Sequence, residues 1–198
     1  MAKLIPALLM AATLLTGHRA YAETPPLRIG VNFERTGSIS SYGLHALVSA
    51  QIAADEINKA GGVLGKPVEV LARDSGDVTT ATIEASIADL VTAQADVLVG
   101  PSSSVLAERV IPKLVAAKLP MISPAATSVR VRSMASDGYF FRTIGSAALE
   151  GTALAKTIGG GKARIAIIYF DDDMGRAVLG RMRAELAASG SLVSVQKI

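Results

Sequence analysis

The chain contains no cysteine, and this absence excludes two kinds of chemistry. No disulfide can hold the fold together, and no thiolate can act as a nucleophile or metal ligand. Histidine is nearly as scarce, and His18 lies in a segment with the features of a cleaved leader, which leaves His45 alone. A Ser-His-Asp triad would have to use His45, and no G-x-S-x-G motif is present. A zinc site would lack a second histidine or a cysteine. We therefore expect no catalytic residues, no metal and no cofactor.

The sequence also lacks a long block of charge of one sign. Lys and Arg together number 20 against 17 for Asp and Glu, and loss of Lys3 and Arg19 with the leader would nearly balance them. Nucleic-acid binding needs basic residues clustered on one face, so we expect no nucleic-acid partner. Half of the residues are hydrophobic, which is enough to build a core without disulfides.

The leader itself has the three parts of an export signal. Lys3 gives a positive start, Leu4–Leu15 is an apolar run, and Ala20-Tyr21-Ala22 is a small-x-small cleavage pattern. The alternative is a membrane anchor, but a spanning helix needs about 20 apolar residues. We therefore predict a signal peptide over residues 1–22, cleaved before Glu23, and a mature protein outside the cytoplasm.

Strand and helix patterns alternate along the rest of the chain. Short apolar runs predict strands at 27–33, 68–72, 96–100, 120–123, 139–142, 164–169 and 192–198. Amphipathic spacing predicts helices at 42–60, 79–95, 104–118, 147–158 and 175–189. This order is typical of doubly wound parallel sheets, an α/β class. We expect a first α/β lobe over 23–143, a crossing near 143–148, and the start of a second lobe over 144–198.

Glycine and acidic clusters have simpler explanations than cofactor or metal sites. Neither Gly61–Pro67 nor Gly159–Ala163 places Ser or Thr after its Gly-Lys pair, and no G-x-G-x-x-G opens the first helix. Turns and helix caps account for both. The run Asp171-Asp172-Asp173 lacks the EF-hand spacing and precedes a helix. Helix capping is therefore the favoured role, with a hard-cation site as the alternative.

Two polar loops follow predicted strands and form the strongest candidate for a binding site. They are Gly100–Ser104 and Ser123–Ser128. Ligands of open parallel sheets bind beyond the carboxyl ends of the strands, and a helix N-terminus offers free N–H groups to an anion. Thr127 can donate and accept hydrogen bonds, and a carbonyl near Ala125 can accept from an ammonium group. The loops suit a small zwitterion, while caps and turns alone remain the alternative.

Several longer motifs make the chain resemble the periplasmic leucine/isoleucine/valine-binding proteins, the substrate-binding components of amino-acid ABC transporters. The matching stretches include Ala54–Pro67, Val99–Ser104, Ile122–Thr127 and Ala166–Asp173. The resemblance runs from about residue 27 to residue 198, in the order of the family. It implies a type I periplasmic-binding-protein-like fold, in which two lobes joined by a hinge close on the ligand.

The resemblance also implies roles for individual residues. Ser104 and Thr127 would hold the carboxylate of an amino acid of branched-chain type or of a similar small polar solute. The carbonyl of Ala125 and the hydroxyl of Thr127 would receive its ammonium group. Tyr42 matches a tyrosine of the cleft wall, and Ser103 belongs to the same loop as Ser104. The partners would be this ligand and an ABC permease in the membrane. The full-length protein would be a monomer in the periplasm.

Three departures from the family pattern qualify these expectations. Met174 stands before Gly175 where leucine-type members place a cleft tyrosine, and Glu34-Arg35 places charges where apolar residues and Pro are usual. The family is also considerably longer, so we expect a fragment or truncated gene product with an incomplete second lobe. Two other functions stay open: a ligand-sensing domain of the same fold and an exported enzyme on a doubly wound sheet.

Overall fold

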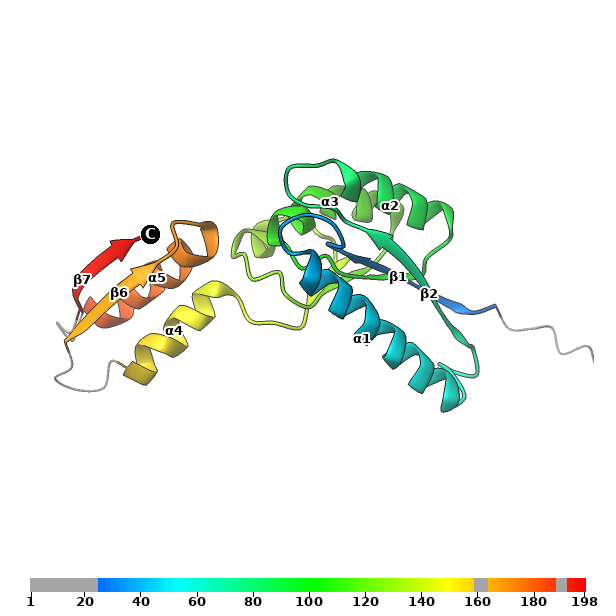
Figure 1. Cartoon of the computed structure of the whole chain (residues 1–198), viewed down its shortest axis with the longest axis horizontal. Coiled ribbons are helices and arrows are strands. Elements are labelled where there is room, and N and C mark those ends of the chain that lie inside the picture. Colours follow the sequence, from blue (N-terminus) through cyan, green and yellow to red (C-terminus); the bar gives the residue numbers. More distant parts are fainter. Residues whose placement is uncertain (1–24, 159–163, 188–191) are drawn as a thin grey trace, which may run out of the picture.

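The computed structural model describes residues 25–158, 164–187 and 192–198, which form two parallel sheets flanked by helices (Figure 1). The predicted signal peptide at 1–22 and the glycine-rich segment at 159–163 therefore lie outside the described residues. In the part of the chain that is described, no helix combines the length and apolarity needed to cross a membrane.

The larger sheet has five parallel strands in the order β2-β1-β3-β4-β5. Its strands are β1 (Leu27–Phe33), β2 (Val68–Asp74), β3 (Val97–Val99), β4 (Met121–Ser123) and β5 (Phe140–Arg142). The chain moves from β1 to one side for β2 and to the other side for β3. This reversal is the topological switch point at which open α/β sheets bind ligands.

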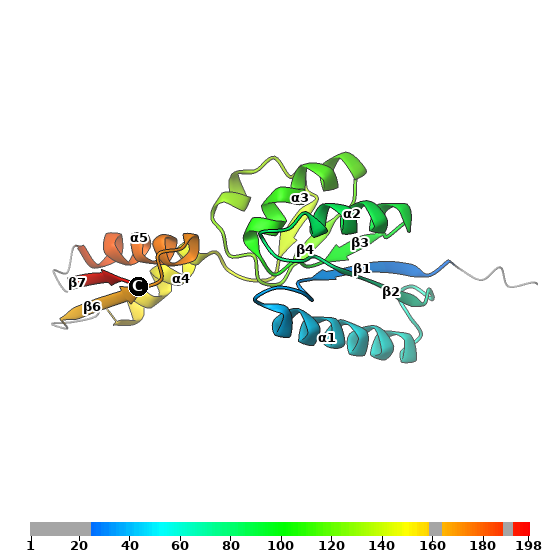
Figure 2. The same cartoon turned by 45° about the horizontal axis from the view of Figure 1, so that its top comes forward.

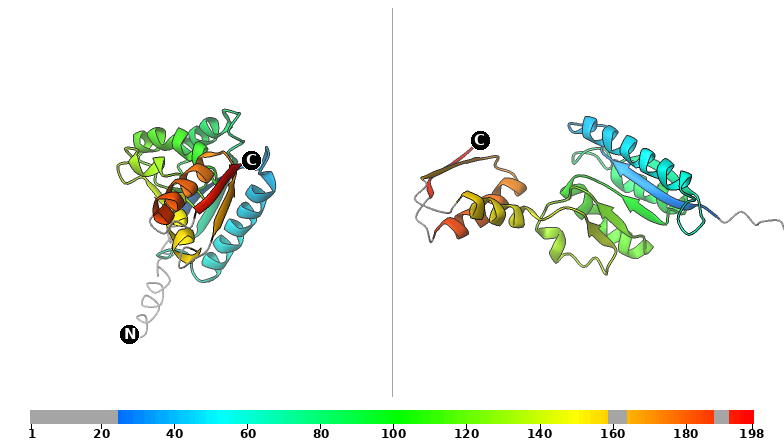
Figure 3. Two further views of the ribbon diagram at one scale, coloured as in Figure 1. Left: turned by 90° about the vertical axis from the view of Figure 1, so that its left-hand side faces the viewer. Right: turned by 90° about the horizontal axis from the view of Figure 1, so that it is seen from below.

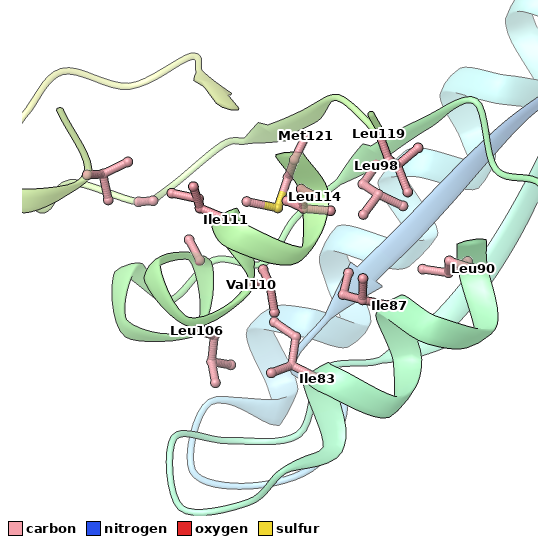
Figure 4. Packing of buried hydrophobic residues seen from close by; sticks show 13 residues of the cluster. Ile83, Ile87, Leu90, Leu98, Leu106, Val110, Ile111, Leu114, Leu119 and Met121 are labelled. Carbon is pink, nitrogen blue, oxygen red and sulfur yellow. The ribbon is translucent and has the colours of Figure 1, made fainter. Parts of the chain in front are cut away.

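Three helices cover this sheet, with α1 (Ser40–Lys59) on one face and α2 (Thr82–Thr92) and α3 (Ser104–Ala117) on the other (Figure 2). The core lies between the sheet and α2 and α3, as Figure 4 shows. Ile83, Leu106 and Met121 are completely buried there. Each buried side chain of this size contributes about 1.5–3 kcal/mol, so this layer fixes where the following loops emerge.

The smaller sheet pairs β6 (Ile165–Tyr169) with β7 (Leu192–Lys197), and α4 (Ala147–Ile158) and α5 (Asp173–Ala187) pack beside it. Gly151 permits close packing of the helices, because a Cβ there would lie 2.5 Å from the carbonyl oxygen of Val178. Figure 3 shows this part joined to the larger sheet by the segment between β5 and α4. We call the part built on β1 to β5 the first lobe and the part built on α4 to β7 the second lobe.

The α/β class, the parallel sheets and the predicted order of elements are confirmed, with differences at the element ends. Helix α2 begins at Thr82 instead of residue 79, because Asp77 binds the backbone N–H of Thr79 and holds a turn there. Helix α5 begins two residues early, because Asp172 Oδ1 accepts a hydrogen bond from Gly175 N at 2.7 Å. Asp172 therefore has the predicted capping role.

One short element was not predicted, the 3-10 helix η1 (Arg130–Ser133) between β4 and β5. The exact division into lobes at residues 143–148 stays a prediction.

Candidate ligand-binding site

The loop after β3 is organised around a buried carboxylate. Glu34 follows β1 and is completely buried. Its two carboxylate oxygens accept hydrogen bonds from the backbone N–H groups of Ser102 at 3.2 Å and Ser103 at 2.8 Å. The Oγ atom of Ser103 also caps α3 by accepting from Leu106 N at 3.4 Å. A negative group here complements the positive end of the helix dipole, so the loop is held before any ligand arrives.

The loops after β3 and β4 are tied to each other. The Ser123 hydroxyl donates to the Pro101 carbonyl oxygen at 2.6 Å and accepts from Ala126 N at 3.1 Å. The Oγ atom of Ser104 accepts from Ser128 N at 3.1 Å. Two separate hydrogen bonds therefore set the distance between the loops that carry Ser104 and Thr127.

An arginine at the end of β5 supports the second of these loops from behind. Arg142 Nη1 donates to the carbonyl oxygens of Ala126 at 3.1 Å and Ser128 at 2.9 Å. These two carbonyls flank Thr127, so the guanidinium group fixes the backbone on both sides of that residue.

A cavity of about 380 Å³ lies where these loops face the second lobe. Small-molecule sites have volumes of about 300–1,000 Å³, so this one suits a small solute. Its lining comes from both lobes and comprises Ser104, Val105, Glu108, Thr127, Ser128, Asp172, Asp173, Met174 and Arg176.

The first-lobe wall offers hydrogen-bond donors. Among the described residues, no hydrogen bond uses the backbone N–H groups of Ser104 and Thr127 or the Thr127 hydroxyl. Ser104 is the first residue of α3, where backbone N–H groups lack partners within the helix. Glu108 on the next turn is occupied, since its Oε1 accepts from Ser128 Oγ at 2.6 Å. This wall can therefore receive a carboxylate or carbonyl oxygen.

The second-lobe wall carries a network of opposite charges. Arg176 donates through Nη1 to Asp171 Oδ1 and through Nη2 to Asp173 Oδ1, both at 2.8 Å. The hydrogen bond from Arg176 lowers the pKa of the Asp171 carboxyl below its ordinary value. Met174, which is 44% exposed, lies between Asp173 and Arg176 in the sequence, so the wall combines one thioether with ionised groups.

Three of the six candidate residues from the sequence meet at this cavity: Ser104, Thr127 and Met174. The other three do not line it. Tyr42 lies half-exposed on α1, Ala125 is partly buried in the loop before Thr127, and the Ser103 hydroxyl caps α3. The binding roles of all six stay predictions.

Sequence reasoning missed Glu108 and Arg176, and it gave Asp172 and Asp173 a capping role without placing them at the cavity. A signal existed for Glu108, because it lies four residues after Ser104 and so shares a helix face with it. Arg176 lies three residues after Asp173 on α5, and the same rule could have paired them.

Comparison with known proteins bears on the family and the fold of the chain. A sequence profile of the family described as periplasmic binding protein matches residues 26–196. A Leu/Ile/Val-binding protein of Rhizobium johnstonii is 29% identical over 184 residues, which cover 91% of this chain and 48% of that protein.

Solved structures show the same fold. The branched-chain amino acid transporter substrate-binding protein of Streptococcus pneumoniae, in complex with isoleucine, has a TM-score of 0.76 and 28% identity and covers 87% of this chain. A solute-binding protein of an ABC transporter from Rhodopseudomonas palustris, in complex with 3,4-dihydroxybenzoic acid, has a TM-score of 0.70 and 23% identity, again over 87% of this chain. The chain spans 49% and 47% of those two structures. With the family match over nearly its whole described length, the chain belongs to the periplasmic binding proteins.

Proposed function

We propose that this chain provides the ligand-binding region of a periplasmic substrate-binding component of an ABC transporter. The ligand would be an amino acid or a similar small polar solute. The observation that carries the proposal is the cavity between the lobes, lined by Ser104 and Thr127 on one side and Met174 on the other. The Leu/Ile/Val-binding relative and the isoleucine complex support an amino-acid ligand.

In the proposed binding mode, the first lobe receives the ligand carboxylate. The backbone N–H groups of Ser104 and Thr127 and the Thr127 hydroxyl would donate to its oxygens, as helix N-termini do for anions. The oxygen of the Thr127 hydroxyl would accept from the ammonium group. No bond of the ligand would be broken, and the protein would act by binding alone.

Transport would follow from closure of the lobes. A ligand that touches both walls has a higher affinity for the closed form, and so shifts the population toward it. The closed form would dock on a membrane permease and release the solute there.

A binding titration with a paired variant tests the site. Thr127→Ala removes a hydroxyl that would contact a charged ligand group, a contact worth about 1.5–3 kcal/mol, so affinity should fall at least about tenfold. The titration follows amide NMR signals, which detect binding even at millimolar affinity. The compounds to titrate are leucine, isoleucine, arginine, citrulline, glutamate and benzoate. Thr92→Ala is the matched control, because Thr92 Oγ1 bonds only within α2. Equal affinities for Thr127→Ala and the unmodified chain would place the ligand elsewhere.

Uptake measurements separate the transporter from a ligand sensor. Deleting the gene should abolish uptake of the labelled ligand by cells. Unchanged uptake, together with a lost transcriptional response to the same ligand, would support the sensor instead.

A further inference from the structure

We infer that the solute held between the lobes carries a net positive charge, as a basic amino acid does. This inference rests on the proposed function and concerns the same cavity. Two observations carry it: the buried carboxylate of Glu34 behind the first wall, and the excess of carboxylates over basic groups on the cavity surface.

The first observation concerns the end of α3 that would attract an anion. A helix N-terminus favours negative charge because its N–H groups point outward. Here the N–H groups of Ser102 and Ser103 already bind the Glu34 carboxylate. In the described residues, no basic side chain forms an ion pair with Glu34. Its charge therefore offsets the helix dipole next to Ser104 and disfavours a ligand that is an anion overall.

The second observation concerns the surface of the cavity. Three carboxylates line it, from Glu108, Asp172 and Asp173, against the single guanidinium of Arg176. The Arg176 guanidinium also binds Asp171, so its charge is shared between two carboxylates. Arg130, outside the lining, pairs with Glu108 at 3.5 Å, and Lys197 pairs with Asp171 at 3.2 Å. With these groups counted, one carboxylate remains in excess of the basic groups, which favours a cation over an anion.

The positions of free acceptors show where that cation would bind. Asp172 uses Oδ1 to cap α5, and Asp173 uses Oδ1 for Arg176. For the parts of the chain with described positions, no hydrogen bond uses the Oδ2 atom of either residue. Both residues lie across the cavity from the donors of Ser104 and Thr127. A solute with a carboxylate at one end and a cationic group at the other matches both walls.

An aliphatic side chain matches the second wall poorly. It would cover the free Oδ2 atoms of Asp172 and Asp173 without offering a hydrogen bond, and burying a polar atom without a partner is costly. Sites built to hydrogen-bond a ligand group reject analogues that lack it. Only Val105 and Met174 supply apolar side chains to the lining.

Arginine and citrulline provide the test, because they have nearly the same shape and differ in the charge of the distal group. NMR titration of the 198-residue chain at low ionic strength should show arginine binding at least about tenfold more tightly than citrulline, leucine or benzoate. Added salt should weaken arginine binding most, because salt screens exposed charges. Asp173→Asn should reduce the arginine preference over citrulline severalfold. Glu185→Gln, an exposed change on the same helix, should keep it.

The results distinguish failure of the inference from failure of the proposed function. Equal binding of arginine and citrulline, or tighter binding of leucine, glutamate or benzoate, would overturn the positive-ligand inference and leave the binding function standing. An undiminished arginine preference in Asp173→Asn would also overturn it. No binding of any panel member would overturn both.

Discussion

The Oε1 atom of Glu34 lies 2.8 Å from the backbone nitrogen of Ser103, a residue 69 positions later in the chain. This contact connects the end of β1 to the start of α3 through a buried charge. Glu34→Gln should lower the free energy of unfolding by about 1–3 kcal/mol, since an amide cannot accept with both ends and leaves one buried backbone N–H without a partner. Urea unfolding measures this change. Glu56→Gln, an exposed change on α1, should have almost no effect, and equal stabilities for the two variants would contradict the prediction.

Arg142→Met should loosen the loop that carries Thr127. Methionine keeps an unbranched aliphatic stem like that of arginine but lacks the guanidinium group. The substitution therefore removes two charge-assisted hydrogen bonds to the carbonyls of Ala126 and Ser128. We expect a loss of about 2 kcal/mol in unfolding free energy and faster amide hydrogen exchange at residues 126–128. Arg183→Met on the exposed side of α5 is the control. Unchanged exchange in the loop would show that other contacts hold it.

The stability of the chain should depend on Asp74 at neutral pH and lose that dependence in acid. Partial burial alone would raise the pKa of the Asp74 carboxyl, but hydrogen bonds from the Gly76 backbone, the Thr36 hydroxyl and the Arg35 backbone outweigh it and hold the pKa below its ordinary value. Because the ordinary pKa is about 3.9, ionised Asp74 stabilises the fold above about pH 4. That contribution disappears as the pH falls from there through the lower pKa of the folded state.

Thermal unfolding of Asp74→Asn checks this sign. The variant should melt below the unmodified chain at pH 6, and the gap should narrow at about pH 2. Asp137→Asn removes an exposed carboxylate and should show no such convergence. A gap that stays constant over this pH range would refute the role of ionised Asp74.

Export should produce a mature N-terminus at Glu23. Lys3, the apolar run Leu4–Leu15 and the Ala20-Tyr21-Ala22 pattern together predict cleavage there. N-terminal sequencing of protein isolated from the periplasmic fraction gives the answer directly. Recovery of the chain with Met1 intact in the cytoplasm would rule the prediction out.

The alternation of elements could be predicted because each buried strand and helix carries its own periodicity. Val97–Val99 reads as a strand and Ile83, Ile87 and Leu90 share one helix face, whatever surrounds them. The ends of elements depend on single polar contacts, such as that of Asp77 with Thr79. Hydrophobic periodicity therefore predicts where an element ends less accurately than it predicts that the element exists.

The candidate site was predictable only in part. The loops carrying Ser104 and Thr127 follow strands, so strand order places them together. The sequence also marked Glu34 as unusual, but not its partners, because Ser102 and Ser103 reach it only through the pairing of β1 with β3. Arg176 at the cavity depends on how the two lobes face each other, which no periodicity encodes.

The single hydroxyl of Ser123 serves both loops, donating to Pro101 and accepting from Ala126. Residues that share a hydrogen-bond network do not change independently, and their effects on stability fail to add. The route by which such a site acquires a new specificity is therefore constrained. A substitution in one loop alters the background in which every substitution in the other loop is tested, so the order in which changes accumulate decides which of them are tolerated.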